Sequence, residues 1–190
     1  IFAMVMGQGL AHQAVYRYLV EKKVPDLFFN DGIAEYGSPV KKTVFPLVPS
    51  FEEEGKLFGS LAAKRHPGKK ACFLLTDNAL GQDFLRGAKS ELDAAKMKIG
   101  KIERADRTAA QANTQILNLK KDGCDIVITS TYSNLFASAV TYSVSQGFKP
   151  AWFTISYNAN SSTIPLLPES AREGIISSTA VAPDEGFKVA

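Results

Sequence analysis

The sequence predicts an α/β protein with doubly wound parallel sheets. Short apolar runs alternate with helix-length amphipathic stretches along most of the 190 residues, and this alternation is typical of parallel strands joined by helices. The stretch 125–130 has a continuous apolar run, as in strands that are buried on both faces. Polar loops also follow the first two apolar runs, at the strand ends where open α/β sheets bind ligands.

The first fifty residues predict a strand, a helix and a second strand. The apolar run IFAMVM (1–6) ends in Gly7-Gln8-Gly9, and the run VPDLFF (24–29) ends in Asn30-Asp31-Gly32. Between them, LAHQAVYRYLVEKK (10–23) has helical spacing of its apolar residues and a basic end. Both loops should therefore lie at the carboxyl edge of one sheet.

The next segment predicts a loop, a connector and a helix. Gly and Pro mark a loop at 33–39, and the prolines in 43–49 favour an extended connector because proline disfavours helix in the residue before it. Ser50 with Glu53 predicts a capping box that starts a helix. The acidic run 52–54 fits the dipole at the start of this helix better than it fits a pair of catalytic carboxylates.

From residue 70 onward the alternation is regular. We expect strands at 71–76, 97–103, 125–130, 151–155 and 175–179. We expect helices at 82–95, from Ala109 after a capping box of Thr108 and Gln111, and from Leu135 to a stop at Gly147. The stretch 161–167 should form a short helix at most.

The composition indicates a globular protein that does not bind nucleic acid. The chain has 22 basic and 19 acidic residues, a net charge of +3, and no Lys/Arg block longer than two. A surface for nucleic acid or anionic lipid therefore has little support. No apolar run approaches the ~18 residues of a membrane span, so we expect no direct membrane insertion.

The two cysteines are expected to be free and buried. Cys72 lies in ACFLL and Cys124 in GCDIVI, and both contexts favour small buried hydrophobes over a disulfide. The sequence has no C-x-x-C pair and only two histidines, His12 and His66. It therefore predicts no metal site and no cofactor.

Four stretches carry a family resemblance. YLVEKKVPDLFF, VPSFEEEGKLFGSLAAK, LLTDNALGQDFLRGAKSEL and QILNLKKDGCDIVITSTY resemble type I periplasmic solute-binding proteins, in particular the branched-chain amino-acid (Leu/Ile/Val) group of ABC transporters. The resemblance runs from about Val5 to Gly186. It implies the two-lobed type I periplasmic-binding-protein fold, with one lobe incomplete, and an internal fragment of a longer protein. Residues 1–48 would be part of lobe 1, 49–179 lobe 2, and 180–190 a crossing back.

The resemblance also implies a function. Such a protein would be the periplasmic, or otherwise extracytoplasmic, component of an ABC importer, made with a signal peptide, and not an enzyme. By lobe closure it would capture a small carboxylate-bearing solute, either a hydrophobic or branched-chain amino acid or an aromatic or other organic acid, and present it to the membrane permease. An effector domain of a cytoplasmic regulator with the same fold is an alternative. A Rossmann-type oxidoreductase is less favoured, because residues 7–12 read GxGxxH and lack the third glycine.

Lobe 1 would contribute two loops to the site. The start of the helix at Gln8, Gly9 and Leu10 offers backbone N–H groups and a helix dipole to a carboxylate, and a plain tight turn is the alternative. Asn30, Asp31 and Gly32 occupy the second contact loop of the resembling family. Asp-Gly is also a common turn pair, so both interpretations stay open.

Lobe 2 would contribute three side chains, which the resemblance places at Leu80, Tyr132 and Tyr157. Tyr157 stands where amino-acid binders have the acidic residue that pairs with the ligand ammonium. An ammonium without such a partner is poorly compensated in a dry cleft. Two hypotheses follow: the ligand has no α-ammonium, or Asp31 takes over that role from lobe 1.

Overall fold

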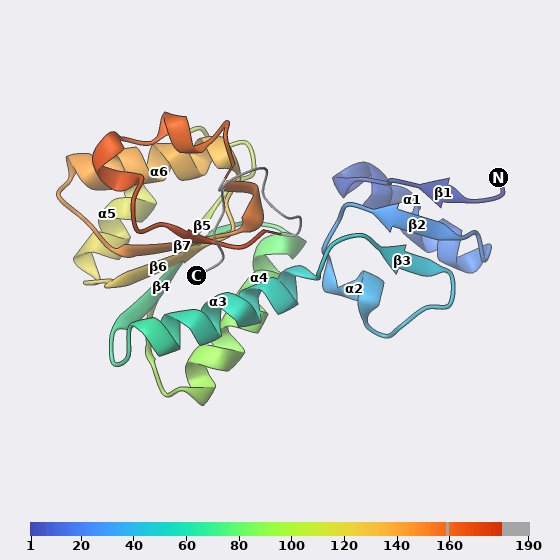
Figure 1. Cartoon of the computed structure of the whole chain (residues 1–190), viewed down its shortest axis with the longest axis horizontal. Helices are drawn as coiled ribbons and strands as arrows, with labels where there is room; N and C mark the ends of the chain where they lie inside the picture. Colours follow the sequence, from blue (N-terminus) through green and yellow to red (C-terminus); the bar gives the residue numbers. More distant parts are fainter. Residues whose placement is uncertain (159, 180–190) are drawn as a thin grey trace.

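The computed structural model describes residues 1–158 and 160–179, and it arranges them around two parallel sheets (Figure 1). The first sheet has the strand order β1-β2-β3, and the second has the order β5-β4-β6-β7-β8. We call the unit around the first sheet lobe 1 and the unit around the second sheet lobe 2. Figure 1 shows the two units side by side, with the chain passing from β3 into α3 where they meet. The predicted α/β class with parallel sheets is confirmed.

Lobe 1 is small and begins the chain. Its elements are β1 (Met4–Val5), α1 (Gly9–Glu21), β2 (Asp26–Phe29), α2 (Ala34–Gly37) and β3 (Val44–Pro46). Its core consists of Tyr16, Phe29, Tyr36 and Val44. The loop expected at 33–39 contains the short helix α2, and the connector expected at 43–49 contains β3. Pairing with β2 in parallel register makes that connector a strand, which local sequence does not reveal.

Lobe 2 contains the remaining elements. They are α3 (Phe51–Arg65), β4 (Lys70–Thr76), α4 (Ala79–Ala94), β5 (Lys98–Ala105), α5 (Asn113–Lys121), β6 (Ile126–Thr129), α6 (Ser133–Ser145), β7 (Ala151–Thr154), the 3-10 turns η1 (Ser156–Asn158), η2 (Ile164–Leu166) and η3 (Glu169–Ala171), and β8 (Ile176–Ser177). The crossing expected at 180–190 lies outside the described residues. The residue bounds of the two lobes stay a prediction.

The sheet of lobe 2 is buried on both faces. Along β4, Phe73 and Leu75 belong to the core cluster under α3 and α4, whereas Cys72 and Leu74 belong to the cluster under α5 and α6. Figure 1 shows these two helix pairs on opposite faces of the sheet. Successive side chains of a strand point to opposite faces, so a continuous apolar run is what such a doubly covered strand requires.

The helix α3 begins where the capping residues predict. The Ser50 hydroxyl accepts a hydrogen bond from the Glu53 N–H at 3.2 Å, and the acidic residues 52–54 lie in the first turn. The second predicted cap is wrong: α5 begins at Asn113 and not at Ala109. Thr108 instead donates from its N–H and its hydroxyl to the Asp106 carboxylate, at 2.7 and 2.5 Å. The side chain of Asp106, two residues upstream, competes with helix initiation for these donors.

The prediction of free cysteines is also wrong. Cys72 and Cys124 form a disulfide, with Cα atoms 5.8 Å apart and a sequence separation of 52. Cys72 lies on β4, and Cys124 lies just before β6, the strand that pairs with β4. The apolar contexts correctly indicate burial, because the two residues are 0% and 6% exposed. Strand adjacency, which local context cannot report, brings the sulfurs together.

Asp122 lies beside the two sulfurs, and this group is the one set of His, Cys, Asp and Glu side chains with metal-ligand spacing in the described part of the chain. The sulfurs bond to each other and are not available as thiolate ligands.

Among residues 1–158 and 160–179, we find no helix with the length and hydropathy needed to cross a bilayer.

Candidate functional site

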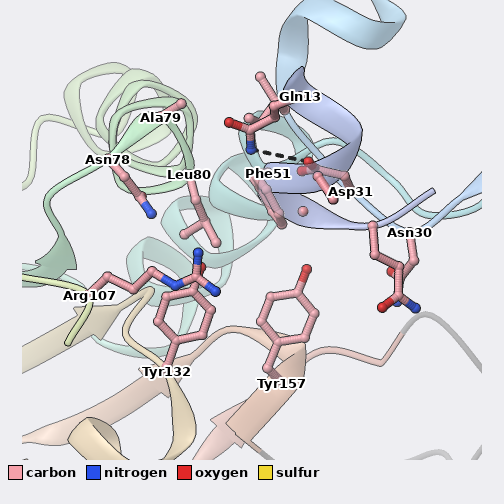
Figure 2. A pocket seen from close by; sticks show the side chains of 14 residues that line it. Gln13, Asn30, Asp31, Phe51, Asn78, Ala79, Leu80, Arg107, Tyr132 and Tyr157 are labelled. Atoms are coloured by element: carbon pink, nitrogen blue, oxygen red, sulfur yellow. Dashed lines mark hydrogen bonds between the residues drawn. The ribbon is translucent and has the colours of Figure 1, made fainter. Parts of the chain in front are cut away.

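A cavity of about 500 Å³ lies between the two lobes (Figure 2). Its volume is within the range of sites for small organic ligands. Both lobes line it, through loops that follow the carboxyl ends of their strands: Gln8, Gly9, Ala11, Gln13, Asn30, Asp31 and Ile33 from lobe 1, and Phe51, Asn78, Ala79, Leu80, Arg107, Tyr132 and Tyr157 from lobe 2. Asp31 and Arg107 are the two charged residues of this lining.

The wall from lobe 1 is built from two neighbouring loops. A parallel bridge pairs Gln8 with Asn30, and the Asn30 N–H donates to the Gly7 carbonyl at 2.9 Å. This pairing continues the β1–β2 ladder and holds the start of α1 beside the end of β2. Gln8 is the N-cap of α1 and makes no side-chain cap to it. The first turn of α1 therefore keeps N–H groups that a ligand or water can use.

Asp31 is the charged group of this wall. It is 4% exposed, and its Oδ2 accepts hydrogen bonds at 3.2 Å from the Gln13 side-chain amide and from the Tyr36 hydroxyl. Figure 2 shows the bond from Gln13, which comes from α1. The carboxylate is thus held rigidly at the edge of the cavity, close to the first turns of α1.

His12 lies below this wall and not among the lining residues. Its Nε2 is 2.6 Å from the Asp26 Oδ2, and both side chains are fully buried. Its ring stacks on Phe29 at a centroid distance of 4.3 Å and meets the Tyr36 ring edge-on. The histidine supports the loops of lobe 1 from inside the core.

The wall from lobe 2 is largely apolar and aromatic. Leu80, in the first turn of α4, is 5% exposed, and Tyr132 is the N-cap of α6. Tyr157 follows β7, and its carbonyl accepts a hydrogen bond from the Ser133 hydroxyl at 3.1 Å. Its ring meets Phe51 edge-on at a centroid distance of 6.3 Å. Figure 2 shows the Tyr157 hydroxyl pointing out of lobe 2, toward the elements that carry Asn30 and Asp31.

Most of the residues chosen from the sequence meet at this cavity. Those that line it are Gln8, Gly9, Asn30, Asp31, Leu80, Tyr132 and Tyr157. Leu10 contributes backbone to the first turn of α1. Gly32 lies behind the lining, where its carbonyl accepts from the Phe51 N–H at 2.6 Å and an added Cβ would lie 2.8 Å from the Pro49 carbonyl oxygen. Gly32 therefore joins lobe 1 to the connector.

Sequence reasoning missed several lining residues, of which Arg107 matters most. Arg107 lies in the turn after β5, and its guanidinium carbon lies 5.2 Å from the centre of the Tyr132 ring. A single arginine in the polar stretch ADRTA looks like an ordinary surface residue. Its place in the loop that follows the strand predicted at 97–103 was the available signal.

We expect Tyr157 to stay protonated well above pH 10. Burial raises its pKa from the ordinary value of 10.0, and the charges of Glu54 and Asp31 raise it further. In the unfolded chain the phenol ionises from about pH 10, so its contribution to stability is complete below that pH and is lost above it. Ultraviolet difference titration compares the wild type with Tyr157→Phe. Both proteins should show the same ionisation near pH 10, because Tyr157 does not ionise there. A smaller ionisation step near pH 10 in the variant would contradict the expectation.

Comparison with known proteins identifies the family. The sequence profile described as periplasmic binding protein matches residues 1–188. No curated protein sequence is significantly similar to the chain. Several solved structures share its fold. A branched-chain amino-acid ABC transporter protein from Thermus thermophilus, solved with valine, superposes with a TM-score of 0.81 at 16% identity, over 93% of this chain and 46% of its own.

Two other solved structures with the same fold are described with other ligands. A solute-binding protein of an ABC transporter from Rhodopseudomonas palustris, in complex with 3,4-dihydroxybenzoic acid, has a TM-score of 0.73 at 16% identity, over 90% of this chain and 48% of its own. A fatty-acid ABC transporter substrate-binding protein from Thermomonospora curvata has a TM-score of 0.78 at 17% identity, over 93% and 46%. This chain spans less than half the length of these proteins, and identities this low establish the fold alone.

The profile match and the fold agree. The profile covers nearly the whole chain, and the parallel sheets superpose on type I periplasmic binding proteins, with part of the two-lobed structure present. The predicted type I fold is therefore confirmed, and the branched-chain amino-acid group is not singled out among the similar structures. The chain belongs to the periplasmic binding protein family.

Proposed function

We propose that this chain is the ligand-binding part of an extracytoplasmic solute-binding protein that delivers a small carboxylate-bearing solute to an ABC importer. The observation that carries the proposal is the cavity between the lobes, lined by loops at the carboxyl ends of both parallel sheets. In open α/β sheets this edge is where ligands bind. The site recognises a solute and releases it to the permease, and no reaction is catalysed.

The walls of the cavity support an acidic solute. Arg107 supplies a cation, and the uncapped start of α6 supplies N–H groups and a positive dipole end. Tyr132, Tyr157 and Phe51 offer aromatic surface for an apolar or planar body. Similar proteins were solved with valine and with 3,4-dihydroxybenzoic acid, and both of these ligands carry a carboxylate.

Binding would act through closure of the lobes. The connector after β3 joins them, and on that side the Ala34 N–H donates to the buried Asp83 carboxylate at 2.7 Å. A solute that contacts both walls favours the closed state by the difference in its affinity for the two states.

Two hypotheses concern the class of solute, and the binding of leucine and of benzoate distinguishes them. A ligand ammonium needs an anionic partner, and Asp31 is the carboxylate among the lining residues. If Asp31 fills that role, leucine should bind tightly and Asp31→Ala should abolish that binding. If the ligand has no ammonium, benzoate should bind and leucine should not. Tight leucine binding that survives Asp31→Ala would contradict both hypotheses.

The proposal is tested on the full-length protein. Mass spectrometry of the protein as purified should reveal a retained small acid, and calorimetry with leucine and benzoate should detect binding. Tyr132→Ala should weaken that binding about tenfold through loss of aromatic contact. Tyr18→Ala, an exposed tyrosine on α1 outside the lining, is the matched control and should not change the affinity. Equal effects of the two variants, or no bound acid in either assay, would count against the proposal.

A further inference from the structure

The two charged residues of the cavity lie on opposite lobes. Arg107 belongs to the wall from lobe 2, and Asp31 belongs to the wall from lobe 1. Figure 2 shows them on different sides of the cavity, with Tyr132 under the guanidinium and Tyr157 beside Tyr132 on the wall from lobe 2. The site therefore has a cationic end and an anionic end.

The turn that carries Arg107 is fixed, and the charge of its exposed side chain is unpaired. The turn that carries it is fixed by the two bonds from Thr108 to the Asp106 carboxylate and by the Ala109 N–H, which donates to the Asp106 carbonyl at 3.1 Å. The guanidinium lies over the Tyr132 ring, and within the described part of the chain it has no ion pair and no hydrogen bond. A guanidinium oriented by a ring beside a cavity is suited to a planar carboxylate.

Asp31 makes the wall from lobe 1 unfavourable for binding an acidic group. Its carboxylate is buried and is bonded to Gln13 on α1. A full negative charge at this place opposes the partial positive charge at the helix start, which is equivalent to about half an elementary charge. The wall from lobe 1 therefore favours a donor, such as a hydroxyl or amino group, over a carboxylate.

We propose that Arg107 binds the acidic group of the solute from lobe 2, while Asp31 accepts a hydrogen bond from a donor at the far end of the solute. This inference rests on the proposed function and orients the ligand within the same site. It differs from the expectation that the start of α1 holds the carboxylate. Because the acid and the donor contact different lobes, the solute bears them at opposite ends of an apolar body, and the tyrosines favour an aromatic one.

The test uses ligands that differ in one group. Calorimetry on the full-length protein compares 4-hydroxybenzoate with 4-hydroxybenzamide, which lacks the charge, and with benzoate, which lacks the donor. We expect 4-hydroxybenzoate to bind about tenfold more tightly than the amide, since a charged hydrogen bond is worth more than a neutral one. We expect a smaller, roughly threefold, preference over benzoate from the hydroxyl bonded to Asp31.

Variants then assign each preference to its residue. Arg107→Gln should remove most of the preference for the acid over the amide and leave the preference for the hydroxyl. Arg65→Gln is the matched control, because Arg65 is an exposed arginine at the end of α3, outside the lining. Asp31→Asn should reduce the preference for the hydroxyl. If Asp31→Asn unfolds, the wild-type comparison of 4-hydroxybenzoate with benzoate still tests the donor end.

The outcomes separate the inference from the proposed function. If Arg107→Gln leaves the preference for the acid unchanged, the start of α1 holds the carboxylate, and the inference fails while the proposed function stands. Leucine binding that Arg107→Gln does not weaken has the same meaning. No binding of leucine or of any of the three aromatic probes would overturn both.

Discussion

Replacing Cys72 and Cys124 together with alanine is expected to lower the free energy of unfolding by about 4 kcal/mol. The bond joins residues 52 apart, and in the chain-entropy model a loop of this length restricts the unfolded state by about that amount. The two alanines also leave small cavities in the core. Urea denaturation of the wild type and the double variant measures the difference.

The same experiment contains its own control. Reducing the wild type should move its urea midpoint toward that of the double variant, while the variant itself should not respond to reductant. Titration of thiols in unfolded, unreduced wild type should find none. Two reactive thiols in the unreduced wild type, or equal urea midpoints for the wild type and the variant, would show that the cysteines are free, as the local sequence predicts.

Replacing Gly87 with alanine is expected to cost about 3 kcal/mol of folding free energy. Gly87 lies on α4 where that helix crosses α3, and an added Cβ would lie 1.9 Å from the Glu52 carbonyl oxygen. Backbone cannot yield to this contact as a flexible side chain would, so the helices must separate, and overpacking of this kind typically costs 1–3 kcal/mol or more. Thermal and urea unfolding of the variant measure the loss.

Gly37→Ala is the matched control for this prediction. Gly37 lies at the end of α2, and an added Cβ there would meet nothing within 4 Å. Its substitution should be neutral or slightly stabilising, because alanine restricts the unfolded chain more than glycine does. If both variants unfold at the same urea concentration, close approach of α3 and α4 does not limit stability.

Much of the fold follows from local sequence. The continuous apolar run of β6 and the capping pair Ser50 and Glu53 predict a doubly covered strand and a helix start, and both are present. The prediction of a helix start after Thr108 is wrong, because the Asp106 side chain accepts the hydrogen bonds of the Thr108 N–H and hydroxyl, which a helix cap would need. A competing side-chain hydrogen bond is a local event that the Ser/Thr-x-x-Glu/Gln pattern does not include.

The candidate site was predictable only in part. Loops after successive strands, such as those at Asn30 and Tyr132, can be chosen from the sequence because parallel strands end at one edge. The place of Arg107 after a predicted strand was a weak signal, and what sets it apart from other surface arginines is the Tyr132 ring beneath it and the cavity beside it. Ligand binding by all of these residues stays a prediction.

The sequence by itself determined the class of fold, most of its strands and helices, and several of the loops that meet at the cavity. These depend on periodicity, turn residues and caps, which act over a few residues. The tertiary structure decided the pairing of Cys72 with Cys124 and the opposition of Arg107 and Asp31 across the cavity. Both depend on which strands and lobes become neighbours, and long-range burial of the core, rather than any local pattern, fixes that arrangement.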